Sequence, residues 1–363
     1  MNLKVIHLAD LHLGKPFHKR SLIDDQAHML TRVLDVMDAK KANLVIAGDV
    51  FDSANPSIEA QELFVWFMRR VMNICEANDT KCIVIVGNHD SNRRLALWQD
   101  LVGDQIFIVR DSMGISIHDV QFFAMSFVKP SIAQVLFGKV FDDYTAAFSA
   151  YLPKEDRENT ILIAHQTFEG CTTGSSEAMT FFDDAVRLDA VKDFPLVMAG
   201  HIHKRQKIKN VYYPGSLMPY AFGDQYAGGI TLWDIEKTEK GINIWHEIVP
   251  VELYRDFLVV RGDLKHCLSV PDNGSYVKVE LVDEGVTLDV ALPQLQAHFG
   301  NLVSAVSKIN DNWEADLNKP VVQFDSIESA LDAFCDLLEV PVFETEQLRL
   351  VQEVAHEITN TEN

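Results

Sequence analysis

Short apolar runs alternate with helical patterns over the first 250 residues of this 363-residue chain. Each run leads into a polar residue or a glycine, and the runs cover residues 3–9, 43–48, 81–87, 160–165 and 196–200. Segments with helical periodicity, residues 26–40 and 58–77, separate the first three runs. Strands that alternate with helices favour an α/β fold with a mainly parallel sheet, covered on both faces. We therefore expect loops at one edge of one sheet to gather the functional groups.

The pattern changes near residue 250. Three apolar runs and two helical segments follow, at residues 257–261, 276–282, 302–309, 264–268 and 288–298. They predict a small α+β module over residues 251–319, after a first domain of residues 1–250.

Residues 320–363 form a third segment with two predicted amphipathic helices. The first, residues 326–339, follows Asp325 as a helix cap, and the second covers residues 346–358. An apolar helix face shows only that something covers it. The two helices either pack onto the preceding domains or dock onto a partner, and the sequence leaves both open.

Composition limits the class of protein. Hydrophobic residues make up 47% of the chain, enough for a sizeable core, and no apolar run reaches the length of a membrane span. The five cysteines are scattered and lack the paired spacing of a structural zinc site. Scattered cysteines in odd number are typical of reduced thiols, so we expect a cytoplasmic protein with no membrane partner.

Charge is unevenly distributed along the chain. The formal net charge of −21 at first argues against a nucleic-acid partner, because proteins that bind phosphates usually carry a basic surface. Residues 320–363, however, carry a net charge of −9, with ten acidic residues and one basic. The windows 13–22, 91–100 and 204–213 instead hold nine cations and one acid, a net charge of +8. These three windows could therefore attract a phosphodiester locally, although the chain as a whole is acidic.

Residues of metal-binding type follow each strand of the first domain. The sequences are DLH (10–12), GDVFD (48–52), GNHD (87–90), a single His at 165 and GHIH (200–203). Alternate residues of an extended segment share a face, so DLH and HIH each present two ligands together. Asp49, after a buried strand, would bridge two ions ~3.5–4 Å apart. Each motif alone is weak, but together they predict a two-metal centre with these ligands: Asp10, His12, Asp49, Asn88, His165, His201 and His203.

The same motifs resemble those of the calcineurin-like metallophosphoesterases. The phosphoprotein phosphatase branch of that superfamily would show GDxxDRG and GNHE, from which this chain departs. GDVFDSANP, GNHDS and GHIHKRQ leading into YYPGSLMPYAFG resemble more closely the SbcD nuclease subunits, the bacterial counterparts of Mre11. The likeness covers essentially the whole chain. It implies a β-sandwich core flanked by helices, a capping domain and C-terminal helices, and it leaves the role of Asp52 open, because some relatives carry a histidine there.

The resemblance also implies roles for the site residues. One ion would be held by Asp10, His12, Asp49 and His203, and the other by Asp49, Asn88, His165 and His201. Mn²⁺ is the favoured metal, although these ligand types do not exclude Mg²⁺, Fe²⁺ or Zn²⁺. His89 would protonate the leaving oxygen or steady the transition state. Asp90 would either orient an imidazole or serve as a simple turn residue.

Cations and aromatic residues near the motifs are candidates for DNA contact. The cations are Lys15, Lys19, Arg20, Arg93, Arg94, Lys204 and Arg205. They would attract DNA locally or, alternatively, balance nearby acids. Tyr213, Tyr220 and Phe222 flank the PGS turn and fit ordinary packing better than base stacking.

The leading hypothesis is a Mn²⁺-dependent DNA exonuclease and single-strand endonuclease that acts on DNA ends and hairpins. The resemblance implies a nuclease subunit of an SbcCD-type (Mre11–Rad50-type) complex, a homodimer within a heterotetramer, docked on the SbcC-like, Rad50-type ATPase through its C-terminal helices. Two alternatives stay open: a stand-alone nucleotide phosphodiesterase or phosphatase, and a DNA-tethering scaffold with little catalysis.

Overall fold

A computed structural model describes residues 2–99, 103–174, 185–224, 226, 228–283 and 285–307. These residues belong to one compact unit that ends at Ser307. The predicted helices at 326–339 and 346–358 lie outside the described residues. No described helix has the length and apolar character needed to cross a membrane. The four described cysteines are buried and form no disulfide, in agreement with the prediction of reduced thiols.

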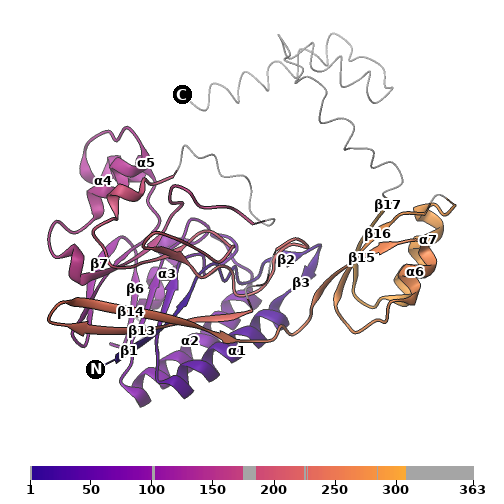
Figure 1. The fold of residues 1–363 in the computed structure, drawn as a ribbon, viewed down its shortest axis with the longest axis horizontal. Coiled ribbons are helices and arrows are strands. Elements are labelled where there is room, and N and C mark those ends of the chain that lie inside the picture. The colour runs from indigo at the N-terminus through magenta and orange to yellow at the C-terminus, as the bar shows by residue number, and fades with distance from the viewer. Residues whose placement is uncertain are drawn as a thin grey trace, which may run out of the picture. The chain divides into compact units, whose positions relative to one another are not determined.

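Two six-stranded sheets form the centre of the first domain (Figure 1). The first sheet has, in spatial order, β14 (Gly241–Pro250), β13 (Gly229–Thr238), β1 (Asn2–Leu8), β4 (Asn43–Ala47), β5 (Cys82–Ile85) and β6 (Ile106–Val109). The second has β11 (Gln206–Ile208), β12 (Val211–Tyr213), β10 (Val197–Gly200), β9 (Thr160–His165), β8 (Val120–Met125) and β7 (Ser112–Ile117). Both sheets are mixed, because β13 pairs antiparallel with β1 and β7 pairs antiparallel with β8.

The strands that lead into the motifs are divided between the sheets. β1, β4 and β5 run parallel in the first sheet, and β9 and β10 run parallel in the second. The expectation that one edge of one sheet gathers the functional groups is therefore wrong. The β-sandwich that the resemblance implied is confirmed. The site forms where parallel strands of two facing sheets end on the same side.

Strand alternation explains why the sheets face each other. In β4 the side chain of Val45 packs between the two sheets, whereas Leu44 and Ile46 face the helices. The helices over the first sheet are α1 (Ile23–Lys40) and α2 (Ile58–Asn78), which contribute Val33 and Phe64 to that layer. Each fully buried side chain of this size stabilises the fold by about 1.5–3 kcal/mol. Both helices were predicted from periodicity and are confirmed.

Shorter elements complete the first domain. They are β2 (Pro16–Phe17), β3 (Arg20–Ser21), α3 (Asn92–Gln99), α4 (Pro130–Phe137), α5 (Tyr144–Tyr151) and the 3₁₀ turns Arg157–Asn159 and Leu188–Ala190. Apolar side chains of α4 and α5 pack on the outer face of the second sheet. The first domain is therefore a sandwich of two sheets between two helical layers.

The small module has the elements that the sequence predicted. A parallel sheet of β15 (Phe257–Gly262), β16 (Tyr276–Leu281) and β17 (Leu302–Ser307) packs against α6 (Leu264–Ser269) and α7 (Leu288–His298). Its core is separate from those of the sandwich and contains Val260, Val279 and Leu295. The module has its own hydrophobic core but sits on the first domain through contacts near the start of α1.

Candidate metal centre

The seven predicted ligands lie together where five strands end. Those of the first sheet follow β1, β4 and β5, and those of the second are the last residue of β9 and the residues after β10. Two groups of predicted ligands have atoms within 4.8 Å of one another: Asp10, His12 and His203 in one, and Asp49, His165 and His201 in the other. A further cluster of the same kind contains His12, Asp52 and His89. The Asn88 side-chain oxygen lies beside the second group, 3.0 Å from His165 Nε2 and 2.8 Å from His201 Nδ1. The groups correspond to the two ligand sets that the resemblance implied.

Asp49 lies between the two groups. Its Oδ2 is 3.7 Å from His12 Nε2 and 3.4 Å from His165 Nε2. Its Oδ1 accepts the backbone N–H of His89 at 2.9 Å. One carboxylate oxygen within reach of imidazoles from both groups is the arrangement that a bridging ligand requires.

Four of the ligands have left-handed backbones. The φ angles are 55° at Asp10, 42° at His12, 50° at Asp49 and 98° at His201. Each such conformation costs about 1–3 kcal/mol and persists only where surrounding contacts fix it. Here the N–H of Asp10 donates to Gly48 O at 3.1 Å and that of His12 to Asp49 O at 3.0 Å. The N–H of His201 donates to the Asp10 carboxylate at 3.0 and 3.2 Å. The loops of both sheets therefore support one another's strained ligands.

The glycines beside the ligands serve two purposes. Gly48 has a φ of 87°, a left-handed conformation that glycine adopts without steric cost in a tight turn. Gly87 and Gly200 have ordinary φ angles, but a Cβ there would overlap the Asp49 carboxylate or the carbonyl of Ala47. Close approach of the loops, and not backbone freedom, requires glycine at these two positions.

The imidazoles present the chemistry that a divalent cation requires. Burial lowers the pKa of His12, His201 and His203, so all three are neutral at pH 7. His12 Nδ1 lies 3.3 Å from a carboxylate oxygen of Asp52, which favours the proton on Nδ1 and leaves the lone pair on Nε2. That Nε2 lies 3.0 Å from Nε2 of His203. Neutral imidazole nitrogens that converge with carboxylates fit a pair of divalent cations.

Metal binding is expected to release protons at pH 7. Burial opposes the charge on His165, but the adjacent Asp49 carboxylate outweighs it and raises the pKa above its usual value of 6.5. In the metal-free protein this ion pair contributes its full stability below pH 6.5 and loses it as pH rises through the raised pKa. A cation must displace this proton, so apparent affinity rises over the same interval. Calorimetric Mn²⁺ titrations in buffers of different ionisation enthalpy should detect release of about one proton. Binding without proton release would contradict the assignment of His165.

Residues 3–205 match the family model of the calcineurin-like phosphoesterases. The chain belongs to this family. The matched span contains all seven predicted ligands and ends two residues after His203. The protein is therefore a hydrolase of phosphate esters, and the family implies divalent metals at the two ligand groups.

Similar proteins come from bacteria and archaea. The D subunit of the nuclease SbcCD from Staphylococcus epidermidis is 27% identical over 336 residues, which cover 86% of this chain and 87% of that protein. The corresponding protein from Staphylococcus saprophyticus is 27% identical over 284 residues, 73% of each chain. The solved structure of an archaeal phosphodiesterase is 13% identical, covers 68% of this chain and all of that one, and has a TM-score of 0.32.

His89 lies at the edge of the phosphoesterase site and is exposed. Its Nδ1 donates to the backbone carbonyl of Asp52 at 2.8 Å, and its ring centroid is 4.9 Å from that of His12. The tautomer implied by this bond leaves Nε2 available to substrate. His89 is outside the two groups of predicted ligands, although its ring lies in a cluster with His12 and Asp52. Its exposure and its position beside the ligands suit a catalytic role.

Asp90 connects the loop after β4 to the loop after β5 through hydrogen bonds. Its carboxylate accepts the N–H groups of Val50 at 3.1 Å, Phe51 at 2.9 Å and Gly87 at 2.9 Å. Burial and the nearby Asp49 raise its pKa. Among the described residues it accepts no hydrogen bond from an imidazole. The geometry therefore favours the turn-forming role over the orientation of a histidine.

Asp52 is the site residue whose role the sequence left open. Its carboxylate lies 3.3 Å from His12 Nδ1 and 2.7 Å from Lys15 Nζ. Burial alone would raise its pKa, but His12 and Lys15 together lower it to about 2. A charged carboxylate behind a ligand imidazole fixes its orientation and tautomer. The second aspartate of GDVFD was the sequence feature that could have indicated this.

The predicted DNA-contact cations differ in their surroundings. Lys15 pairs with Asp52, and Arg20 donates to the side chain of Asn301 and the carbonyl of Leu302. The half-buried guanidinium of Arg205 donates to the carbonyls of Pro214 and Gly229. The remaining four cations are exposed: Lys19, Arg93, Arg94 and Lys204. These four are best placed to reach a phosphate backbone, and Arg94 also donates to the side chain of Asn55.

Aromatic residues near the PGS turn are packed, as the sequence favoured. Tyr213 and Tyr220 are buried, and Tyr220 donates its hydroxyl to the carbonyl of Leu11. Phe222 packs against the ring of Phe17. None of the three is placed to stack on a base.

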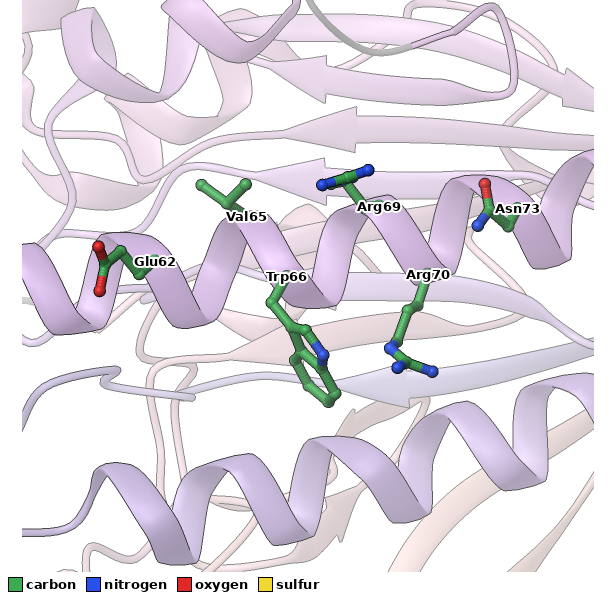
Figure 2. Close-up of a pocket in the computed structure, with 6 residues that line it drawn as sticks. All are labelled: Glu62, Val65, Trp66, Arg69, Arg70 and Asn73. Carbon is green, nitrogen blue, oxygen red and sulfur yellow. The ribbon is translucent and has the colours of Figure 1, made fainter.

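A pocket of about 550 Å³ lies on the outer side of α2 and contains none of the metal ligands (Figure 2). Its lining residues are Glu62, Val65, Trp66, Arg69, Arg70 and Asn73. Figure 2 shows Trp66 and Arg70 on the same side of the helix, and the guanidinium carbon of Arg70 is 5.1 Å from the Trp66 ring centroid. This is a cation–π contact on the surface of α2, away from the predicted ligands.

Proposed function

We propose that this phosphoesterase is a metal-dependent DNA nuclease that acts in the cytoplasm as the nuclease subunit of an SbcCD-type complex, with Mn²⁺ as its favoured metal. The observation that carries the proposal is the gathering of the seven predicted ligands at one place in a chain that is similar to the D subunit of SbcCD over 86% of its length. That similarity extends beyond the phosphoesterase match at residues 3–205.

The residues of the site have different roles in the proposed hydrolysis of a phosphodiester. Bound divalent cations would supply positive charge to the phosphate oxygens and lower the pKa of a water molecule. Asp49 fixes the spacing between the two ligand groups, and Asp52 holds His12 in the required tautomer. Exposed His89, anchored through Nδ1, would deliver a proton to the leaving oxygen from Nε2 when its ring is in the imidazolium form, and would then regain that proton from solvent.

DNA contact is proposed for the exposed cations Lys19, Arg93, Arg94 and Lys204. They follow three of the metal motifs, so they would attract the phosphate backbone close to the ions. With a net charge of −21, the protein should bind DNA weakly when alone and lose that binding as salt increases.

An ATPase partner would supply the missing affinity for DNA. The Staphylococcus relatives are each named as one subunit of the nuclease SbcCD, which implies a further subunit in their complexes. We propose that residues 320–363 dock on an SbcC-like, Rad50-type ATPase and that two copies of this chain assemble in a heterotetramer. Support comes from the apolar faces predicted at 326–339 and 346–358.

Nuclease assays with and without the ATPase test this proposal. We expect Mn²⁺-dependent release of nucleotides from duplex, hairpin and end-blocked DNA, faster with the ATPase present, and little hydrolysis of cyclic nucleotides. A chain that ends at residue 307 should hydrolyse a small diester normally but gain nothing from the ATPase. Preference for cyclic nucleotides would favour the stand-alone phosphodiesterase, and DNA binding without any hydrolysis would favour the scaffold.

A further inference from the structure

Gln26, on the first turn of α1, holds the loop that carries His12. Its Nε2 donates to the carbonyls of His12 at 2.8 Å and Leu11 at 3.3 Å, and its Oε1 accepts the N–H of Gly14 at 3.0 Å. The Gln26 side chain is only 2% exposed, so water does not replace these bonds. Because His12 has a left-handed backbone, its position depends on such external support. Gln26 thus fixes a metal ligand without being one.

Asp25, the preceding residue, holds the small module. Its Oδ2 accepts a hydrogen bond from Nη1 of Arg255 at 2.6 Å and another from the hydroxyl of Tyr276 at 2.9 Å. Arg255 lies just before β15, and Tyr276 is the first residue of β16. Asp25 is 1% exposed and the Arg255 side chain 27%, so this ion pair between the domain and the module has a buried carboxylate and a partly exposed guanidinium. Adjacent helix residues point about 100° apart, which lets Asp25 and Gln26 face different neighbours from one turn.

The hairpin that follows the His12 loop makes a second contact with the module. The Phe17 ring centroid is 5.0 Å from that of Phe257 and 5.5 Å from that of Tyr276. Arg20 donates to Asn301 Oδ1 at 3.1 Å. The module therefore touches both the continuation of the metal loop and the helix turn that supports it.

We propose that Asp25 and Gln26 are positioning residues. They couple the contact between the small module and the first domain to the position of the metal ligand His12. This inference rests on the proposed function, because it requires that the site bind divalent cations. A shift of the module at Arg255 and Tyr276 pulls on the turn of α1 that carries Asp25. Gln26 moves with that turn and changes the support of the His12 backbone. Contacts that the module makes are thereby transmitted to the affinity of the site for metal.

The first test concerns Gln26 alone. In Gln26→Met the side chain keeps its length and loses both donor and acceptor. We expect Mn²⁺ binding to the full-length protein, measured by calorimetry, to weaken about tenfold, the effect typical of removing support behind a metal ligand. Thermal unfolding of the metal-free variant checks that it is folded.

The second test concerns the coupling. In the double variant Asp25→Leu/Arg255→Met both charges are removed together, so no unpaired charge stays buried. We expect Mn²⁺ affinity to fall several-fold, although neither residue contacts a ligand side chain. The control is Arg32→Met, which breaks the exposed Arg32–Asp35 pair on the same helix and should leave affinity unchanged.

The outcomes separate this inference from the proposed function. Wild-type protein that binds no Mn²⁺ would overturn the metal centre and the coupling with it. Normal Mn²⁺ binding by the wild type with unchanged affinity in folded Gln26→Met would overturn only the role of Gln26 and so the coupling. Weakened binding in Gln26→Met but not in the folded double variant would overturn the transmission from the small module.

Discussion

Replacing Asp49 by asparagine is expected to abolish metal-dependent hydrolysis. Its Oδ2 lies near imidazoles of both ligand groups, 3.7 Å from His12 and 3.4 Å from His165. Loss of a group that merely supports a ligand weakens metal binding by about 10- to 100-fold. Loss of a bridging carboxylate removes charge from both ions at once, so the effect should exceed that range.

Asparagine keeps the shape of the residue, which makes the change informative. Its amide oxygen can still accept the N–H of His89, so the backbone of the GNHD loop keeps its contact. The measurements are Mn²⁺ stoichiometry by calorimetry and the rate of DNA hydrolysis. Asp35→Asn, on the exposed face of α1, is the matched control and should behave as the wild type. Retention of two bound ions and full activity in Asp49→Asn would contradict the bridging assignment.

The clustering of the predicted ligands could be foreseen from sequence because the pattern that produces it is local. Each motif places its polar residues directly after a strand, and a parallel strand fixes the direction in which the chain leaves. Hence Asp10, Asp49 and His201 were assignable without knowing which strands pair. The division of the strands between two sheets was not predictable from alternation, because the pairing of β9 with β8 and β10 depends on long-range contacts.

Roles that depend on distant partners were not predictable. Asp90 carries the same carboxylate whether it faces an imidazole or three backbone N–H groups, and only the fold shows the latter. Arg205 adds to the count of cations near the motifs, yet its guanidinium donates to backbone carbonyls. Gln26 belongs to no motif, although it holds the loop of His12. The sequence gives the charge and polarity of a side chain but not the group with which that side chain forms its hydrogen bonds.

Replacing His89 by asparagine is expected to slow DNA hydrolysis while leaving metal binding unchanged. His89 lies outside both ligand groups, and its Nδ1 is held by the carbonyl of Asp52. General acid catalysis by a positioned imidazole contributes about 10²–10⁴-fold to rate. We expect a loss of that size in kcat on DNA, with Mn²⁺ affinity as in the wild type. His118→Asn, at the exposed β7–β8 turn, is the control for the same substitution.

The leaving group decides between the two roles considered for His89. A DNA strand leaves as an alkoxide and needs a proton, whereas nitrophenolate is stable without one. If His89 is the general acid, His89→Asn should lower kcat far less with bis(p-nitrophenyl) phosphate as substrate than with DNA. If His89 instead steadies charge on the phosphoryl oxygens, both substrates should lose rate equally, because that charge develops with either leaving group. The bond between Nδ1 and the Asp52 carbonyl leaves Nε2 as the ring nitrogen that serves in either role, so the ratio of the two rate losses decides between them.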